Sequence, residues 1–205
     1  MSNTLNDVVE IVDSHLQYGR WNPIIGDTAS RLANVFVETA ILPSLESANR
    51  VILEARQIMA SCNSPGETVT PRTGLVCGRV QSGKTSSMTS LAALARDNGF
   101  RIVILIAGVT TILVDQNRER LQETLRRASA NHSWMMLLNP KAPRNIAEIQ
   151  AVAQEWGSEI YSEDDRRTLL IIVMKNVTHL GIVAQLLNIA LVSAFRAILI
   201  VDEAE

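Results

Sequence analysis

The segment from Gly78 to Thr85 has the residue types and spacing of a phosphate-binding loop. It reads Gly-Arg-Val-Gln-Ser-Gly-Lys-Thr, which fits the pattern G-x-x-x-x-G-K-S/T. Glycine tolerates the backbone angles that turn consecutive N–H groups toward one anion, and a helix beginning at Lys84 adds its positive amino-terminal end. We expect the phosphates of ATP to be bound by Gly78, Val80, Gln81, Ser82, Gly83, Lys84, Thr85 and Ser86.

Four side chains have more specific expected roles. Lys84 can reach the β- and γ-phosphates, and the Thr85 hydroxyl suits Mg²⁺, which prefers oxygen ligands. Further along the chain, the aliphatic run Ala197–Val201 ends in Asp202 and Glu203. An ATPase of this kind needs a carboxylate beside Mg²⁺ at the end of a neighbouring strand. We therefore expect Asp202 to help hold Mg²⁺ and Glu203 to orient or deprotonate the attacking water.

The elements that must position these residues follow from the pattern of aliphatic runs. After Gly74, short aliphatic runs alternate with helical patterns, which is typical of a mostly parallel sheet with crossover helices. The runs at 102–107 and 169–174 are continuous, as in strands buried on both faces. We predict strands at 74–77, 101–107, 134–138, 168–174 and 197–201, and helices on both faces of the sheet at 84–97, 111–128, 145–156 and 177–192. Residues 157–167 are polar and acidic, and we predict an exposed loop there.

The first seventy residues have a helical pattern. Apolar residues between Val8 and Leu16 recur at helical spacing, and a second helical stretch extends from about Asp27 to Ala60, with a break at Pro43. Asp27 or Thr28 could cap its start. Residues 61–73 are rich in Ser, Pro, Gly and Thr and are typical of a linker. We therefore predict a helical N-terminal segment at 1–70 and an α/β P-loop lobe at 71–205.

Composition and charge exclude several classes of protein. The chain has 205 residues with 47% hydrophobic and 20% charged side chains, so it is not intrinsically disordered. No apolar run reaches the roughly 18–20 residues that cross a bilayer, and with no secretory signal and only two cysteines we expect a cytoplasmic protein with reduced thiols. The net charge of −2 is unevenly distributed, because residues 78–147 carry ten basic and four acidic side chains. The net charge therefore does not exclude a nucleic-acid partner.

Two families resemble parts of this sequence. Asp202-Glu203-Ala204-Glu205 looks like the second motif of superfamily 2 helicases. The segment 109–116 lies where those proteins carry P-T-R-E-L-A-x-Q; Thr110, Leu113 and Gln116 match, whereas Val109, Thr111 and Ile112 do not. A closer resemblance, over 74–205, is to the bacterial Z-one-domain proteins, which are often labelled endonucleases. It rests on the segments 74–85, 97–108, 113–119 and the V-x-K-N segment ending at Asn176.

The Z-one-domain resemblance implies a RecA-like lobe of a helicase-like ATPase that uses Mg-ATP, acts on DNA and belongs to a bacterial defence system. Another defence protein is then a further possible partner. In helicase-like enzymes a second lobe supplies an arginine finger, and here that lobe would follow Glu205. We therefore expect this chain to be a fragment that binds ATP with little turnover. No cluster of carboxylates and lysine is typical of a nuclease centre.

Two alternatives remain open on the sequence alone. A small-molecule P-loop kinase has the same phosphate loop, although the Asp-Glu pair favours a hydrolase. A scaffold that binds ATP without hydrolysing it is the other alternative. The base-reading motif of GTPases is absent around Lys175. Lys175 and Asn176 follow a core strand, so they could contact a ligand or start the next helix.

Overall fold

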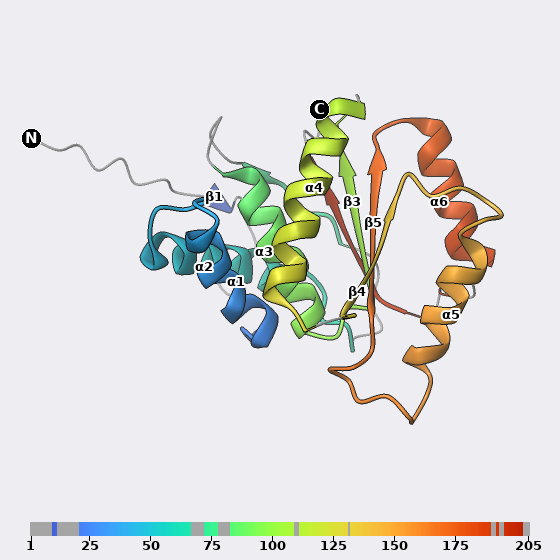
Figure 1. Cartoon of the computed structure of the whole chain (residues 1–205), viewed down its shortest axis with the longest axis horizontal. Helices are drawn as coiled ribbons and strands as arrows, with labels where there is room; N and C mark the ends of the chain where they lie inside the picture. Colours follow the sequence, from blue (N-terminus) through green and yellow to red (C-terminus); the bar gives the residue numbers. More distant parts are fainter. Residues whose placement is uncertain are drawn as a thin grey trace, which may run out of the picture.

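The centre of the molecule is a four-stranded sheet in which all strands are parallel (Figure 1). Its strands are β3 (Ile102–Ala107), β4 (Trp134–Leu138), β5 (Thr168–Met174) and β6 (Ala197–Val201), in the order β4-β5-β3-β6. The computed structural model describes residues 10–11, 21–66, 72–77, 83–108, 111–130, 132–189, 192 and 195–202. The chain is therefore an α/β protein, and the four predicted strands that form this sheet are confirmed.

The continuous aliphatic runs explain why β3 and β5 lie at the centre of the sheet. All six residues of β3 and the first six of β5 are buried. Ile104 pairs with Ile171 on one side and with Leu199 on the other, in parallel register. A strand covered on both faces does not alternate apolar with polar residues, so the sequence pattern and the burial agree.

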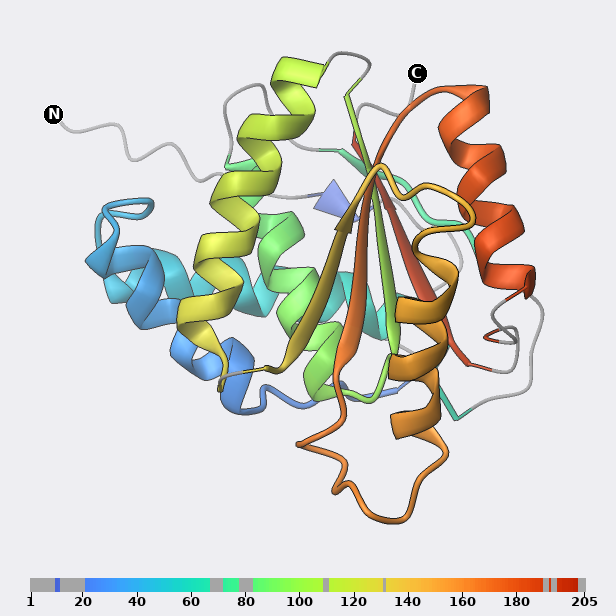
Figure 2. The same ribbon diagram turned by 45° about the vertical axis from the view of Figure 1, so that its right-hand side comes forward.

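Helices cover both faces of the sheet, as predicted (Figures 1 and 2). On one face lie α3 (Lys84–Asp97) and α4 (Thr111–Ala128), which contribute to a core with Val103, Leu105 and Ile172. On the other face lie α5 (Ile146–Trp156) and α6 (Val177–Ile189), which share a second core with the isoleucines of β3. Each sheet face thus has its own apolar cluster.

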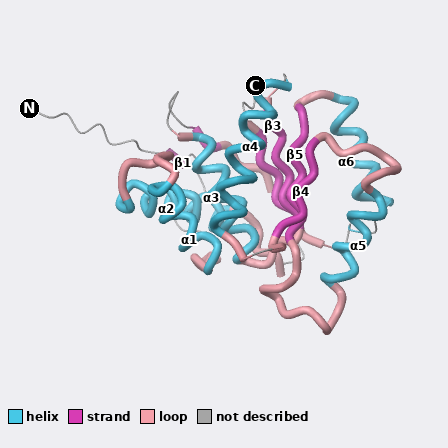
Figure 3. The backbone as a smooth tube through the Cα atoms, viewed as in Figure 1, coloured by secondary structure: helices cyan, strands magenta, loops and turns pink. Residues whose placement is uncertain are grey.

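Two N-terminal helices form a further layer outside α3 and α4. These are α1 (Asp27–Glu38) and α2 (Leu45–Ser61), and Figure 3 shows them side by side with α3. The predicted break falls between them, where Ser44 and Ser47 form a capping box that starts α2. Leu32, Phe36, Ile52 and Met59 are buried in the same cluster as α3. Helices α1 and α2 are therefore packed against α3.

The start of α1 is held by the end of α3 rather than by its own residues. Gly26 is the N-cap and supplies no side chain. Instead, the Asp97 carboxylate accepts the backbone N–H groups of Thr28 (3.1 Å) and Ala29 (2.8 Å). The prediction that Asp27 or Thr28 caps this helix is wrong, because a carboxylate some seventy residues away occupies that role.

The two short strands of the chain differ from prediction. β1 (Glu10–Ile11) pairs antiparallel with β2 (Val76–Cys77). The predicted strand at 74–77 is therefore not part of the parallel sheet. The prediction of a helix around these residues is wrong at Glu10 and Ile11, and its other residues lie outside the described parts of the chain. The β-branched run Val8-Val9-Glu10-Ile11-Val12 favours extended backbone. In the described residues, no helix has the length and apolarity to cross a membrane.

Candidate functional site

The start of α3 has the backbone geometry of an anion site. Gly83 is its N-cap, with φ 75° and ψ 30°, a left-handed conformation that favours glycine. Among the described residues no side chain caps this helix start, and no acidic residue lies in its first turn. The first N–H groups of a helix lack partners within the helix and carry its positive dipole end. An anion such as a phosphate is the natural acceptor for them.

The three residues after Gly83 become less exposed along the helix, so the first of them is the most accessible to a ligand bound at the helix end. Lys84 is exposed, Thr85 is half-buried and Ser86 is buried. The Lys84 ammonium is therefore free to follow a ligand, whereas Ser86 is held within the protein. Thr85 is further tied into the helix, since its carbonyl accepts the Thr89 hydroxyl at 2.7 Å.

Asp202 lies at the same edge of the sheet as the start of α3. It follows β6, and its N–H donates to the Ile106 carbonyl of β3 at 2.9 Å, so it sits beside the carboxyl end of the central strand. α3 runs antiparallel to β3, to which its last residue is joined by residues 98–101 (Figure 1). Its first turn therefore lies at the carboxyl edge, where parallel sheets bind ligands.

The remaining predicted site residues lie outside the described parts of the chain. They are Gly78, Val80, Gln81, Ser82 and Glu203. The structure thus places Gly83, Lys84, Thr85, Ser86 and Asp202, and these described residues lie at one edge of the sheet.

The described donors fit Mg²⁺ better than a transition metal. Within the described residues, no group of three or more His, Cys, Asp or Glu side chains could hold a metal ion. Mg²⁺ keeps several waters and needs only one or two protein oxygens beside the substrate phosphates. The Thr85 hydroxyl and the Asp202 carboxylate are oxygens of this kind.

Asn139 and Asn176 shape the same edge, and sequence reasoning missed the first of them. The Asn139 side-chain oxygen accepts the Met174 N–H at 2.9 Å, and its φ of 40° is left-handed, which Asn tolerates. The Asn176 side-chain oxygen accepts the His179 N–H at 2.9 Å and thereby caps the start of α6. Of its two predicted roles, Asn176 has the helix-start one. An Asn directly after a strand was the available signal for Asn139.

No protein-family model, no curated protein and no solved structure matches this chain.

Proposed function

We propose that this chain is the ATP-binding, RecA-like lobe of a helicase-like ATPase that hydrolyses Mg-ATP and acts on DNA. The observation that carries the proposal is the start of α3. Gly83 is its N-cap, no side chain caps it among the described residues, and it lies at the same sheet edge as Asp202. It is the one place among the described residues where free helix N–H groups, a lysine, a hydroxyl and a carboxylate belong to a single sheet edge.

In this proposal each residue has a role that follows from its chemical type. The backbone of 79–85 and the Lys84 ammonium bind the phosphates, while Thr85 and Asp202 hold Mg²⁺, in large part through water. The metal ion neutralises charge that develops on the phosphate oxygens. Glu203 orients the attacking water. Gln81 approaches the γ-phosphate.

The charge distribution supports a polyanion partner. The basic stretch 78–147 includes the second half of α4, where Arg120, Arg126 and Arg127 are exposed. Arg127 is partly neutralised by Glu123 at 2.6 Å, whereas the other two have no ion pair among the described residues. Lysine and arginine contacts to phosphates supply most of non-specific DNA affinity. The resemblance to Z-one-domain proteins adds a bacterial defence system as the setting, with a second lobe and another defence protein as partners.

A binding experiment tests the phosphate site. Lys84→Ala should weaken Mg-ATP binding at least about tenfold in calorimetry, because it removes a charge-assisted contact to the phosphates. Lys141→Ala is the matched control, since Lys141 is also exposed and lies outside the predicted site. Equal ATP affinity of wild type and Lys84→Ala would show that the assignment is wrong.

A turnover experiment tests the reaction and the DNA. In a protein that carries this lobe together with the second lobe that the proposal requires, the expected result is ATP hydrolysis that rises when DNA is added and is lost in Glu203→Gln, whereas the lobe alone should bind ATP with little turnover. ATP binding with transfer of phosphate to a small acceptor would indicate the kinase instead. ATP binding with neither reaction would indicate a scaffold.

A further inference from the structure

A cavity lies at the amino-terminal edge of the sheet, opposite the edge of the proposed ATP site. Its volume is about 340 Å³. The residues that line it and carry the argument are Arg101, which precedes β3, Trp156 at the end of α5, Glu163 and Arg166 from the 157–167 loop, and Arg196, which precedes β6. Lys84 and Asp202 belong to the other end of the strands, so this cavity is separate from the proposed ATP site.

The cavity has more positive than negative charge on its walls. Arg101 is only 7% exposed and is ion-paired with Glu163. The same carboxylate is also the partner of Arg166, so one acid serves two guanidinium groups. Arg196 is exposed and has no ion pair among the described residues. Three cations therefore face one anion, which leaves an excess of two positive charges.

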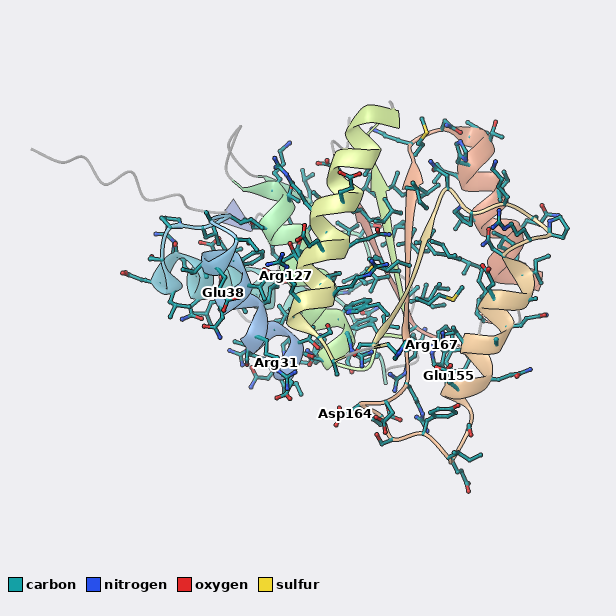
Figure 4. All side chains as sticks on the ribbon, in the orientation of Figure 1. Arg31, Glu38, Arg127, Glu155, Asp164 and Arg167 are labelled. Atoms are coloured by element: carbon teal, nitrogen blue, oxygen red, sulfur yellow. The ribbon has the colours of Figure 1, made fainter. Side chains whose placement is uncertain are left out.

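The other acidic groups nearby do not remove this excess within the cavity. Glu155 is ion-paired with Arg167, and Figure 4 shows the two side chains next to each other. The Asp165 carboxylate accepts the Ser162 hydroxyl at 2.6 Å. Asp164 acts electrostatically on Arg101 but is exposed and does not line the cavity.

One residue that lines the cavity also has a buried donor without an acceptor. The Arg166 Nε–H is buried and makes no hydrogen bond, although the other end of the same guanidinium donates to the Ser158 carbonyl at 3.0 Å. Burial lowers the pKa of the Arg101 guanidinium, and Arg166 lowers it further, against the opposing effect of Glu163. Buried unpaired donors and crowded cations both cost stability. An anion in the cavity would relieve the second of these costs, the mutual repulsion of the cations.

We propose that this cavity binds a phosphate group. A phosphate dianion matches the excess of two charges, and guanidinium groups bind phosphate oxygens through paired N–H donors. The exposed Arg196 guanidinium is the donor, with Arg101 and Arg166 as the more buried charges behind it. The cavity has room for a small carrier of the phosphate as well as for inorganic phosphate.

Nuclear magnetic resonance of the arginine Nε–H groups tests the site directly. The full chain with Lys84→Ala, which separates this site from the proposed ATP site, is titrated with inorganic phosphate and with ribose 5-phosphate. The expected result is a saturable shift of the Arg166 Nε–H signal with either probe. If ribose 5-phosphate binds more tightly than inorganic phosphate, the ligand is a phosphorylated small molecule. If the two bind equally, the ligand is free phosphate. Both results support the site.

A pair of exposed arginine variants completes the experiment. Arg196→Gln should weaken phosphate binding about tenfold, the effect of one charge-assisted hydrogen bond. Arg50→Gln, on the exposed side of α2, should leave it unchanged. Because both side chains are exposed, both variants should keep the wild-type circular dichroism spectrum. No saturable shift up to about 10 mM phosphate, or an equal effect of the two variants, would overturn the proposal. Neither outcome tests the proposed ATP site, which lies at the other edge of the sheet.

Discussion

Asp97 combines a structural role with an unfavourable location for a charge. Its carboxylate accepts two N–H groups at the start of α1, and Gly26 lies so close that a Cβ there would be 2.8 Å from the Asp97 Cγ. Burial raises the pKa of the Asp97 carboxyl, and the accepted backbone N–H groups offset only part of that rise. The residue therefore stabilises α1 while its negative charge is costly.

Asp97→Asn should change how stability depends on pH. The folded pKa of Asp97 is raised, so its contribution to the free energy of unfolding is complete below the unfolded pKa of about 3.9 and declines as pH rises through the folded pKa. The stability of wild type relative to Asp97→Asn should therefore fall across that window. Urea unfolding at a series of pH values measures this difference, with Asp27→Asn as a control at the same helix start. A difference that grows with pH would contradict the raised pKa.

The same residue shows where prediction from local sequence ends. The phosphate-loop pattern correctly placed the start of α3 at Lys84, because Gly83 supplies the left-handed turn that the helix start requires. The start of α1 was also placed correctly at Asp27, but its cap was not. A cap contributed by Asp97 depends on tertiary packing, and no residue near Asp27 signals it.

At the scale of elements, Arg96 connects the end of α3 to the loop between α5 and β5. Its Nη1 donates to the carbonyls of Ser133 (2.8 Å) and Arg166 (2.9 Å), and its Nη2 donates to the Asp164 carbonyl (2.7 Å). Its guanidinium also lies 5.9 Å from the centre of the Trp134 ring. The predicted loop at 157–167 is confirmed as a largely exposed loop, and it is held in place by a side chain of another element.

Replacing Arg96 should therefore loosen that loop. Arg96→Met keeps the apolar stem of the side chain but removes the guanidinium and its three carbonyl contacts, so about 2–4 kcal/mol of stability should be lost. Amide hydrogen exchange over 158–167 should become faster, while exchange over β3 changes only with global stability. Arg50→Met, on the exposed side of α2, is the control. Unchanged exchange in the loop would contradict the role of Arg96.

Strands were predictable where burial alone determines them. β4, β5 and β6 have the predicted bounds, and β3 differs by one residue, because aliphatic runs between polar segments leave few alternatives. The pairing of β1 with β2 was not predictable, since each has two residues and their partners lie far apart in the sequence. Short strands carry too little periodicity to indicate register.

At the scale of the whole molecule, the N-terminal helices share their core with the sheet. The cluster that contains Leu32, Phe36 and Met59 also contains Leu94 of α3 and Leu105 of β3. The sequence predicted the helices but contained no information on what they contact. The structure places α1 and α2 against α3, the helix that begins with Lys84.

This shared cluster, together with the sheet whose other face carries the second cluster, predicts one cooperative unfolding transition. Trp21 reports on the N-terminal layer, since its Nε1 donates to the Cys62 carbonyl at 3.1 Å and its ring lies 6.5 Å from that of Phe100. Trp156 reports on the opposite face of the sheet, where its ring lies 4.7 Å from that of Phe195. If both layers unfold together, both tryptophans must change their fluorescence at the same urea concentration.

Two variants make this comparison. Trp134→Phe with Trp156→Phe leaves Trp21 alone, and Trp134→Phe with Trp21→Phe leaves Trp156 alone. Each fluorescence midpoint should coincide with the far-ultraviolet circular dichroism midpoint of the same variant, which corrects for the stability that each pair of substitutions removes. A Trp21 midpoint clearly below the circular dichroism midpoint would show that α1 and α2 detach first, and the shared apolar cluster would then contribute less than its burial implies. Coincident midpoints in both variants would establish that α1, α2 and the two faces of the sheet unfold as one unit.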